Sequence, residues 1–390
     1  MKVLVAMSGG VDSSVAAYLL KKKGYEVTGV SFELWDKRDL KTSSVCCSVE
    51  TIELAKSVAH TLGIEHYTID VRDAFYRHVI EEFCESYIKG TTPNPCILCN
   101  KHIKFDFLLK KAEELGSEAV ATGHYARIEK QGAGIRSEAT RTEDQGSEQL
   151  PQGTGCLTQH TDNRQRMKVS SHQYLLKKGM DPKKDQSYFL YVMRQEELSR
   201  TLFPLGEMTK EQTRGIAGDL GLVTALAPES QEICFVGNNK YADFINELAP
   251  EALRPGPVID MNGNVVGEHK GIIFYTVGQR RGLGISSLQP YYVAGIDHTH
   301  NTIIVGSRED ATRKVLKVRE LNWISIGSLT GSLRAEVKIR STMRGVPSRL
   351  RPDKNDTVIV EFDAPQWAPA PGQSAVFYSG DTVIGGGIIE

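Results

Sequence analysis

Seven residues near the start of the chain, Ser-Gly-Gly-Val-Asp-Ser-Ser at positions 8–14, constrain the fold more than any other feature. They stand between an apolar run at 2–6 and an amphipathic stretch at 12–23. Gly9 and Gly10 allow positive φ and close backbone approach, and a helix that starts here offers N–H donors. The order therefore predicts a first parallel strand, a phosphate-binding loop and a helix.

The loop contains no lysine. A Walker-type loop needs a lysine before its Ser or Thr to reach the β- and γ-phosphates. Positions 8–14 therefore indicate a different cleavage of ATP, one that releases pyrophosphate and leaves AMP on the substrate, and they resemble the loop of ATP pyrophosphatases. A glycine-rich turn without a ligand is the alternative interpretation.

The first 125 residues alternate between two periodicities. Strand patterns at 2–6, 26–32, 65–69 and 119–122 are separated by helical patterns at 12–23, 49–62, 72–88 and 105–115. This alternation predicts an α/β domain with a Rossmann-like parallel sheet, covered on both faces, and ligands at the carboxyl edge. Residues 8–14, 32–35 and 122–124 fall at that edge. At this edge, Gly123 either lets a nucleotide approach the backbone closely or is simply a turn glycine.

Composition sets the class of protein. A chain of 390 residues suggests two or three domains, and 40% hydrophobic with 24% charged residues is typical of a soluble globular protein. The net charge of −1 gives no global basic field for nucleic acid. No signal peptide or long apolar run is recognisable, so we expect a cytoplasmic protein without a membrane partner. Seven cysteines favour reactive or metal-binding thiols over a disulfide framework.

The periodic spacing of apolar residues also indicates how the chain divides into domains. It disappears at about 129–171, where we expect a mobile insertion that includes Cys156. From 289 onward, period-two strands at 292–295, 302–306, 334–340, 357–362, 374–378 and 382–389 predict a β-barrel. The expected domains are a catalytic domain at 1–205, a small central domain at 206–288 and the barrel at 289–390. Residues 311–354 hold eleven Lys or Arg against three acidic residues, which indicates phosphate contacts or merely charged strand faces.

Three cysteines stand in distinctive segments. Cys96 and Cys99 form a Cys-x-x-Cys inside the proline-bracketed segment 93–100, and Cys234 lies far along the chain in 230–235. A Cys-x-x-Cys alone can be a redox pair, half a zinc site or part of an iron–sulfur site. Cys46 and Cys47 could complete a zinc site or relay sulfur. Spacing alone leaves these alternatives open.

Taken together, several motifs resemble the bacterial and mitochondrial tRNA-specific 2-thiouridylases. They occur in that family's order at 8–14, 93–105, 121–126, 183–190, 230–235, 275–284 and 371–378. The resemblance implies a pyrophosphatase-type N-terminal domain, a small central domain and a C-terminal barrel. It also implies ATP- and Mg²⁺-dependent thiolation of C2 of the wobble uridine in tRNAs for Lys, Glu and Gln. The partners would be the tRNA anticodon stem-loop and a sulfur donor, such as a cysteine desulfurase, a relay protein or free sulfide.

The resemblance also assigns roles to individual residues. It implies ATP contacts by Ala6, Met7, Ser8, Gly9, Gly10, Val11, Asp12, Ser13, Phe32 and Gly123. It implies a target-base loop of Asn94, Pro95 and Cys96, and tRNA contacts by His124, Lys184, Asp185, Gln186, Arg340, Ser341 and Gln373. Cys99 matches the family's nucleophile, and Cys234 matches the cysteine that receives persulfide sulfur, with a disulfide between them as part of that chemistry.

One position departs from the family pattern. Many members have Asp three residues before the nucleophile, where this chain has Cys96. A thiol can replace a carboxylate as a base only if its pKa is lowered. Members with this cysteine resemble thiolation enzymes in which three cysteines hold a [4Fe–4S] cluster. The hypotheses are therefore a cluster on Cys96, Cys99 and Cys234, or persulfide chemistry on Cys99 and Cys234.

Two other classes of function use parts of the same pattern. An adenylating ligase or amidotransferase that acts on a small acid would need the loop at 8–14, but it would give no role to the distant cysteines. A pure RNA-binding module would not need the loop. Hydrolysis of ATP to ADP, or ATP turnover that does not depend on tRNA, would count against thiolation.

Overall fold

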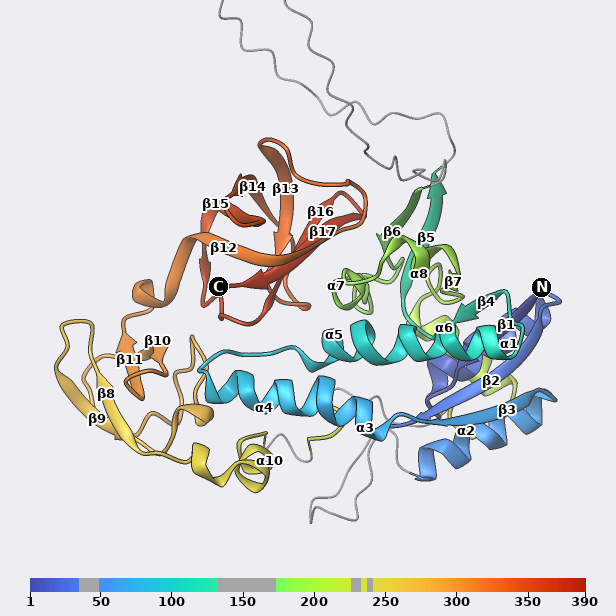
Figure 1. Ribbon diagram of the computed structural model, residues 1–390, viewed down its shortest axis with the longest axis horizontal. Coiled ribbons are helices and arrows are strands. Elements are labelled where there is room, and N and C mark those ends of the chain that lie inside the picture. The colour runs from blue at the N-terminus through green and yellow to red at the C-terminus, as the bar shows by residue number, and fades with distance from the viewer. Residues whose placement is uncertain (35–48, 132–172, 226–232, 237–240) are drawn as a thin grey trace, which may run out of the picture.

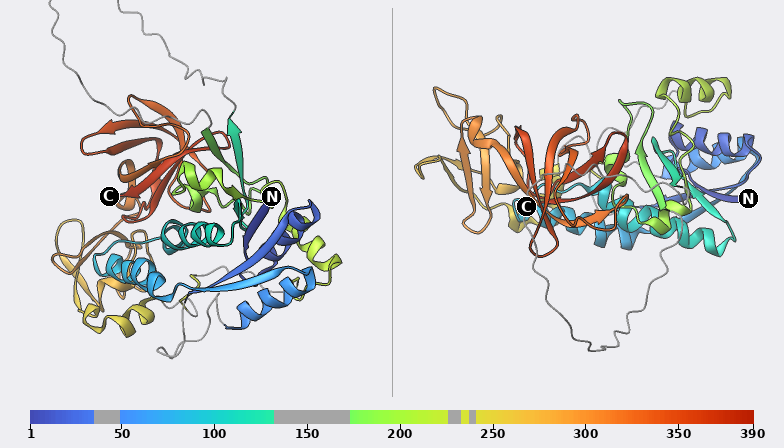
Figure 2. Two further views of the ribbon diagram at one scale, coloured as in Figure 1. Left: turned by 45° about the vertical axis from the view of Figure 1, so that its right-hand side comes forward. Right: turned by 90° about the horizontal axis from the view of Figure 1, so that it is seen from above.

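The computed structural model describes residues 1–34, 49–131, 173–225, 233–236 and 241–390 (Figure 1). A parallel sheet, a four-stranded sheet and an antiparallel barrel make up its three parts. Within these ranges, no helix has the length and apolarity that a membrane span requires. In Figures 1 and 2 the helices α4 to α6 run from the parallel sheet toward the other two parts.

The N-terminal sheet has the order β3-β2-β1-β4-β7, and every neighbouring pair is parallel. Its strands are β1 (Lys2–Ala6), β2 (Glu26–Glu33), β3 (Glu65–Asp70), β4 (Ala119–Ala121) and β7 (Thr201–Leu202). Four of the five were predicted from the sequence, each to within one residue at either end. The predicted α/β class is thus confirmed.

Helices cover both faces of this sheet because alternate residues of each strand point to opposite faces. Val3 and Val5 lie in a core with α1 (Val11–Lys22) and α2 (Val49–Leu62), whereas Leu4 faces a second core. The second core is made by two long helical segments. One runs through α3 (Arg72–Phe75), η2 (Tyr76–Ile80) and α4 (Glu81–Ile88), and the other through α5 (Pro95–Cys99), η3 (Asn100–Lys104) and α6 (Phe105–Glu114).

The segments η2 and η3 are π-helical turns, which often mark functional sites. The rings of His78 and His102 stack between them, with centroids 5.2 Å apart. The turn η3 follows Cys99 directly and ends at Lys104. It therefore separates α6 from α5, the thiol helix, which carries Cys96 and Cys99.

A hairpin links the first domain to the barrel. Its strands are β5 (Ala126–Gln131) and β6 (Gln173–Lys178), and β6 pairs with β17 through Lys177 and Thr382. Residues 129–131, which we expected in the insertion, complete β5 because they pair with 173–175. The rest of the predicted insertion, including Cys156, lies outside the described residues.

The second sheet has the order β10-β11-β8-β9. Its strands are β8 (Gly256–Ile259), β9 (Val265–His269), β10 (Tyr292–Asp297) and β11 (Thr302–Gly306). The last two were expected in the barrel, and this placement was wrong. Period-two patterning identifies a half-buried strand but not the sheet that it joins. The helix α10 (Tyr241–Leu248) packs against the first domain's second core through Phe244 and Ile245.

The helix α9 (Lys210–Asp219) also packs on the first domain. Ala217, together with Leu205 and Leu222, shares a core with Val3 and Val5. The contacts of α9, β10 and β11 therefore cross the domain divisions predicted at 205/206 and 288/289.

The C-terminal strands form a closed antiparallel barrel, as predicted. The order is β12-β15-β14-β13-β16-β17, and β12 pairs with β17 to close it. The strands are β12 (Thr312–Trp323), β13 (Leu333–Lys338), β14 (Val346–Asp353), β15 (Thr357–Trp367), β16 (Ser374–Ser379) and β17 (Thr382–Ile389). Fully buried Val337, Phe362 and Phe377 fill its interior.

Two buried tyrosines join the catalytic domain to the barrel. The short helix α7 (Ser187–Leu190) carries Tyr188, whose hydroxyl donates to the Ser374 carbonyl oxygen at 2.8 Å. The Tyr191 hydroxyl lies 3.0 Å from Ser374 Oγ. Both tyrosines are at most 2% exposed, so these bonds are shielded from water.

We expect Tyr188→Phe and Tyr191→Phe each to lower the free energy of unfolding by about 1–2 kcal/mol, because each removes a buried hydrogen bond. Urea unfolding would measure the change. Tyr67→Phe is the matched control, since Tyr67 is 37% exposed and its hydroxyl bonds a nearby side chain, Glu65, at 3.3 Å. Equal effects at all three positions would contradict a special role for the interface.

Candidate active site

A cavity of about 450 Å³ lies at the carboxyl edge of the parallel sheet. The phosphate loop, the thiol helix α5, the segment around Cys234 and the start of α9 all contribute to its wall. The predicted ATP contacts that line it are Ala6, Met7, Ser8, Gly10, Val11, Asp12, Ser13, Phe32 and Gly123. The other predicted site residues that line it are Pro95, Cys96, Cys99, His124, Lys184, Gln186 and Cys234. The sequence thus predicted most of this wall.

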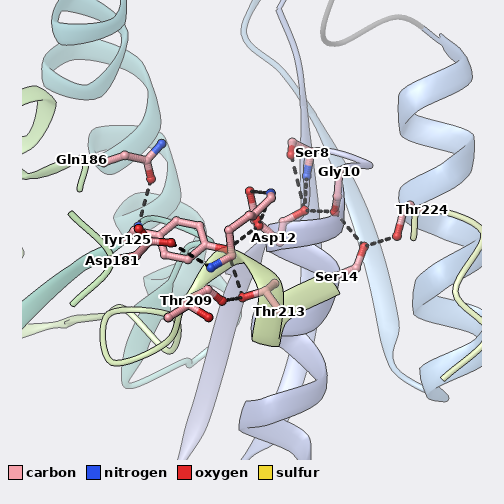
Figure 3. Close-up of polar contacts among 12 residues, drawn as sticks. Ser8, Gly10, Asp12, Ser14, Tyr125, Asp181, Gln186, Thr209, Thr213 and Thr224 are labelled. Carbon is pink, nitrogen blue, oxygen red and sulfur yellow. Dashed lines mark hydrogen bonds and ion pairs between the residues drawn. The ribbon is translucent and has the colours of Figure 1, made fainter. Parts of the chain in front are cut away.

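Internal hydrogen bonds hold the phosphate loop open (Figure 3). The Ser8 N–H donates to Ser13 Oγ at 3.1 Å, and the hydroxyls of Ser13 and Ser14 donate to the Gly10 carbonyl at 3.1 and 2.9 Å. Gly10 precedes α1 in an extended conformation and provides no side-chain cap. The N-terminal N–H groups of α1 are therefore suited to an anionic ligand.

Two glycines keep the loop close to its neighbours. Gly9 has φ +74°, and a Cβ there would lie 2.2 Å from the Thr51 carbonyl oxygen, so Gly9 lets α2 approach and does not line the cavity. A Cβ on Gly123 would lie 2.7 Å from the Ser13 nitrogen. Gly123 therefore serves close packing against the first turn of α1, and its backbone still borders the cavity.

Asp12 is the centre of a polar network that sequence reasoning missed. Lys210 Nζ lies 2.7 Å from both carboxylate oxygens, and the Tyr125 hydroxyl donates to Oδ1 at 2.8 Å. The same hydroxyl is 3.0 Å from Thr213 Oγ1, and burial raises the pKa of Tyr125. A signal for Lys210 existed in the sequence: a lysine at the first position of a helix opposes the helix dipole, so it needs an acidic partner.

The thiol helix presents Cys96 and Cys99 one turn apart. Asn94 precedes the helix in an extended conformation, and Pro95 begins it. Cys96 is exposed, but Cys99 is only 5% exposed. Burial raises the pKa of the Cys99 thiol to about 11, while the nearby Lys104 acts to lower it. The resting Cys99 is therefore a protonated thiol.

Cys234 lines the same cavity, although it lies far from Cys96 and Cys99 in the sequence. It is half-buried, and the neighbouring Phe235 packs edge-on against Phe75 and Phe83, with ring centroids 5.7 and 5.2 Å apart. All three predicted thiols thus line one cavity. Cys46 and Cys47, the alternative ligands, lie outside the described residues.

Among the described residues, Cys96, Cys99 and Cys234 are not grouped around a single metal ion. Across the described ranges, no three His, Cys, Asp or Glu side chains are grouped closely enough to hold a metal ion. The thiols of these three cysteines have the donor chemistry of a [4Fe–4S] cluster, and all three line one cavity, so the cluster on these residues stays a prediction. No step is derived through a cluster.

Neutral and polar groups form the wall between the thiols and the phosphate loop. Thr122 Oγ1 lies 2.6 Å from His124 Nδ1, and burial together with Lys104 holds the pKa of His124 well below its usual value. Gln186 Oε1 accepts the Tyr125 N–H at 2.9 Å. His124 is therefore a neutral imidazole at pH 7.

Asp185, one of the predicted tRNA contacts, is buried away from the cavity. Its side chain is 7% exposed and accepts hydrogen bonds from the N–H groups of Gly179 and Ser187 at 3.1 and 3.0 Å. Lys338 of the barrel lies 3.8 Å from it. These contacts give Asp185 a structural task between the catalytic domain and the barrel.

The predicted contacts on the barrel lie outside the cavity wall. Gln373 Nε2 donates to the carbonyls of Thr92 and Pro93 at 3.1 and 3.2 Å, so it holds the segment that enters α5. The exposed Arg340 donates to the Ala368 carbonyl at 2.6 Å, and Ser341 beside it is half-buried.

Comparison with known proteins gives full-length matches. Family models described as tRNA methyl transferase HUP domain, tRNA methyl transferase PRC-barrel domain and aminomethyltransferase beta-barrel domain match residues 1–238, 242–307 and 313–389. The tRNA-specific 2-thiouridylase MnmA of Clostridioides difficile is 43% identical over 100% of this chain and 98% of its own. MnmA 1 of Caldanaerobacter subterraneus is 45% identical with the same coverage.

The chain belongs to the tRNA-specific 2-thiouridylase family. The predicted resemblance is thereby confirmed. Among solved structures, NMN synthetase from Francisella tularensis is 15% identical over 64% of this chain and 76% of its own, at a TM-score of 0.32. No conclusion rests on that likeness. The family models divide this 2-thiouridylase-family chain at the boundary between β11 and β12, as the sheet pairings do.

We predict that the rate of Cys99 alkylation by iodoacetamide rises about tenfold per pH unit up to at least pH 9.5, because its raised pKa keeps thiolate scarce. Peptide mass spectrometry resolves this site from exposed Cys96, the internal control. Lys104→Met should slow the alkylation of Cys99 further, because it removes the positive charge that favours the Cys99 thiolate. A plateau below pH 9 would contradict the assignment.

Gln373→Leu should lower the free energy of unfolding by about 1–2 kcal/mol, because it removes two hydrogen bonds that hold the entry to α5. It should also speed alkylation of the buried Cys99. Gln366→Leu is the matched control, since half-buried Gln366 bonds the carbonyls of Ala364 and Pro365 within its own strand. Unchanged Cys99 reactivity in Gln373→Leu would contradict the positioning role.

Proposed function

We propose that this protein catalyses ATP-dependent 2-thiolation of a uridine in tRNA. One observation carries the proposal: a lysine-free phosphate loop and three thiols line a single cavity. The loop accounts for activation by ATP, and the thiols account for sulfur transfer. Relatives at 43–45% identity are named for this activity. We assign the target as the wobble uridine of tRNAs for Lys, Glu and Gln.

The chemistry requires activation before substitution. The C2 oxygen of uracil is a poor leaving group, so its attack on the α-phosphate of ATP converts it into an AMP ester and releases pyrophosphate. The N-terminus of α1 and the Ser8 to Ser13 loop would bind the phosphates, where they oppose the negative charge that develops. The cavity-facing carboxylate of Asp12 is suited to Mg²⁺, which ligates one or two carboxylates plus phosphates and would neutralise charge there.

Sulfur transfer is assigned to Cys234 and Cys99. A donor, a cysteine desulfurase or a sulfur-relay protein, leaves a persulfide on Cys234. The terminal sulfur attacks C2 and AMP leaves with the former C2 oxygen. The Cys99 thiolate then attacks Cys234 Sγ, which breaks the S–S bond and leaves sulfur on C2 as 2-thiouridine. The resulting Cys99–Cys234 disulfide is reduced by an external thiol.

Access to the base fits a single-stranded RNA loop. An unstacked nucleotide can leave an anticodon loop at low cost, whereas a duplex nucleotide cannot. His124, Lys184 and Gln186 border the cavity and are assigned to contacts with that nucleotide, as are Asn94 to Cys96. The basic strands of the barrel, with Arg340 exposed, are assigned to the tRNA backbone.

Other reactions leave part of the cavity unused. A ligase or amidotransferase on a small acid would need the phosphate loop but not three thiols. Methyl transfer, which two family-model descriptions mention, would need neither. Thiolation uses both sets of residues in one cavity.

The test is mass spectrometry of tRNA incubated with the full chain, ATP, Mg²⁺ and a persulfide donor. We expect one sulfur added per tRNA and AMP plus pyrophosphate released only when tRNA is present. Cys99→Ala and Cys234→Ala should lower thiolation by at least about a hundredfold, while Cys84→Ala, a buried cysteine outside the cavity, is the control. Formation of ADP, or turnover without tRNA, would contradict the proposal.

The role of Cys96 is tested in the same assay under anaerobic conditions. An iron-free preparation that thiolates tRNA with a persulfide donor supports the two-cysteine route. Activity that requires bound iron and all three thiols would instead support the cluster hypothesis from the sequence. Neither result changes the substrate.

A further inference from the structure

We propose that Lys210 supplies the positive charge that the phosphate loop itself lacks, by binding the pyrophosphate that leaves ATP. This proposal rests on the proposed adenylation step. The loop at 8–14 has no lysine, yet a lysine about 200 residues away in the sequence reaches it in the fold. Lys210 Nζ lies 2.7 Å from Asp12 Oδ1, and both residues line the cavity.

The surroundings hold the Lys210 backbone in place. Lys210 is the first residue of α9, and its N–H donates to Asp181 Oδ2 at 3.0 Å. A capping box precedes it, in which Gln212 N donates to Thr209 Oγ1 at 3.2 Å and Thr209 N to Gln212 Oε1 at 2.8 Å. The ammonium also lies 5.9 Å from the centre of the Tyr125 ring. The side chain is therefore anchored at its base, with its charge at the phosphate loop.

The stability of the fold does not explain the ion pair between Lys210 and Asp12. The side chains of Lys210 and Asp12 are 10% and 34% exposed, so both charges have lost much of their hydration. An apolar pair of similar size is commonly as stable as such a buried ion pair. The first position of a helix also disfavours a cation. A lysine at this position is thus better explained by a ligand than by folding.

The other two lysines that line the cavity, Lys104 and Lys184, belong to other segments. Lys104 is close enough to Cys99 and His124 to affect the pKa of both, which places it at the thiol side. Lys184 belongs to the segment that contacts Tyr125 through Gln186. Lys210 makes a direct contact with a residue of the phosphate loop, Asp12.

The proposed step balances without a protein proton transfer. Uridine O2 forms a bond to the α-phosphorus, and the bond from that phosphorus to the bridging oxygen breaks. The electron pair stays on pyrophosphate, and the uracil N3 proton leaves to water. Lys210 exchanges one Asp12 oxygen for a pyrophosphate oxygen and remains protonated throughout, so it stabilises the charge on the leaving group.

The experiment uses inorganic pyrophosphate as the probe. Binding to the full chain is measured by calorimetry with Mg²⁺ present, for wild type, Lys210→Met, Lys210→Arg and the exposed control Lys56→Met. A charge-assisted hydrogen bond predicts that Lys210→Met weakens pyrophosphate binding about tenfold or more. Lys210→Arg should retain most of the affinity, AMP affinity should change less than about twofold, and Lys56→Met should match wild type. Wild-type pyrophosphate affinity in Lys210→Met would overturn the proposal.

A second variant separates ligand binding from folding. Lys210→Met leaves the Asp12 carboxylate without its ammonium, so stability can fall for that reason alone. The double variant Asp12→Asn with Lys210→Met removes both charges and should regain thermal stability while pyrophosphate binding stays weak. Regained pyrophosphate binding in the double variant would overturn the proposal. The binding measurement needs no tRNA, so a failure of the thiolation assay in wild type counts against the proposed function and leaves this result independent.

Discussion

The carboxylate of Asp12 is the point at which three distant segments of the chain meet. It belongs to the first turn of α1, and it is bound by Tyr125, which follows β4, and by Lys210 at the start of α9. A half-buried carboxylate without these donors would be costly. The requirement that all three segments arrive together therefore fixes the phosphate loop against α9 and shapes the cavity between them.

The segment 184–187 shows how the cavity and the barrel are coupled. Lys184 and Gln186 line the cavity, whereas Asp185 and Ser187 contact the barrel through Lys338 and Tyr378. These four residues form the turn that enters α7, so one short segment serves both partners. The thiol helix is held similarly, because Gln373 of the barrel binds the carbonyls just before it. Docking of the barrel is thus part of how the thiols are positioned.

The sequence predicted the first domain well because its signals are local. Alternating apolar patterns and a loop motif are written in consecutive residues, and β1 and α2 were found at their observed bounds. Pairings between distant residues leave no such pattern. The strands at 292–297 and 302–306 have the same period as barrel strands, and only tertiary contacts place them with β8 and β9. Lys210 was missed for the same reason, since the motif that it completes lies about 200 residues away.

The exposure of the thiols supports a division of labour between them. A buried Cys99 with a pKa of about 11 is almost entirely protonated at pH 7, and the thiolate is the nucleophile. A donor protein cannot easily reach a residue that is 5% exposed, so Cys99 is poorly placed to receive sulfur first. Half-buried Cys234 is the better acceptor. In the proposed mechanism Cys99 would act second, inside the cavity, where Lys104 favours its thiolate and where burial protects it from oxidation until a persulfide is in reach.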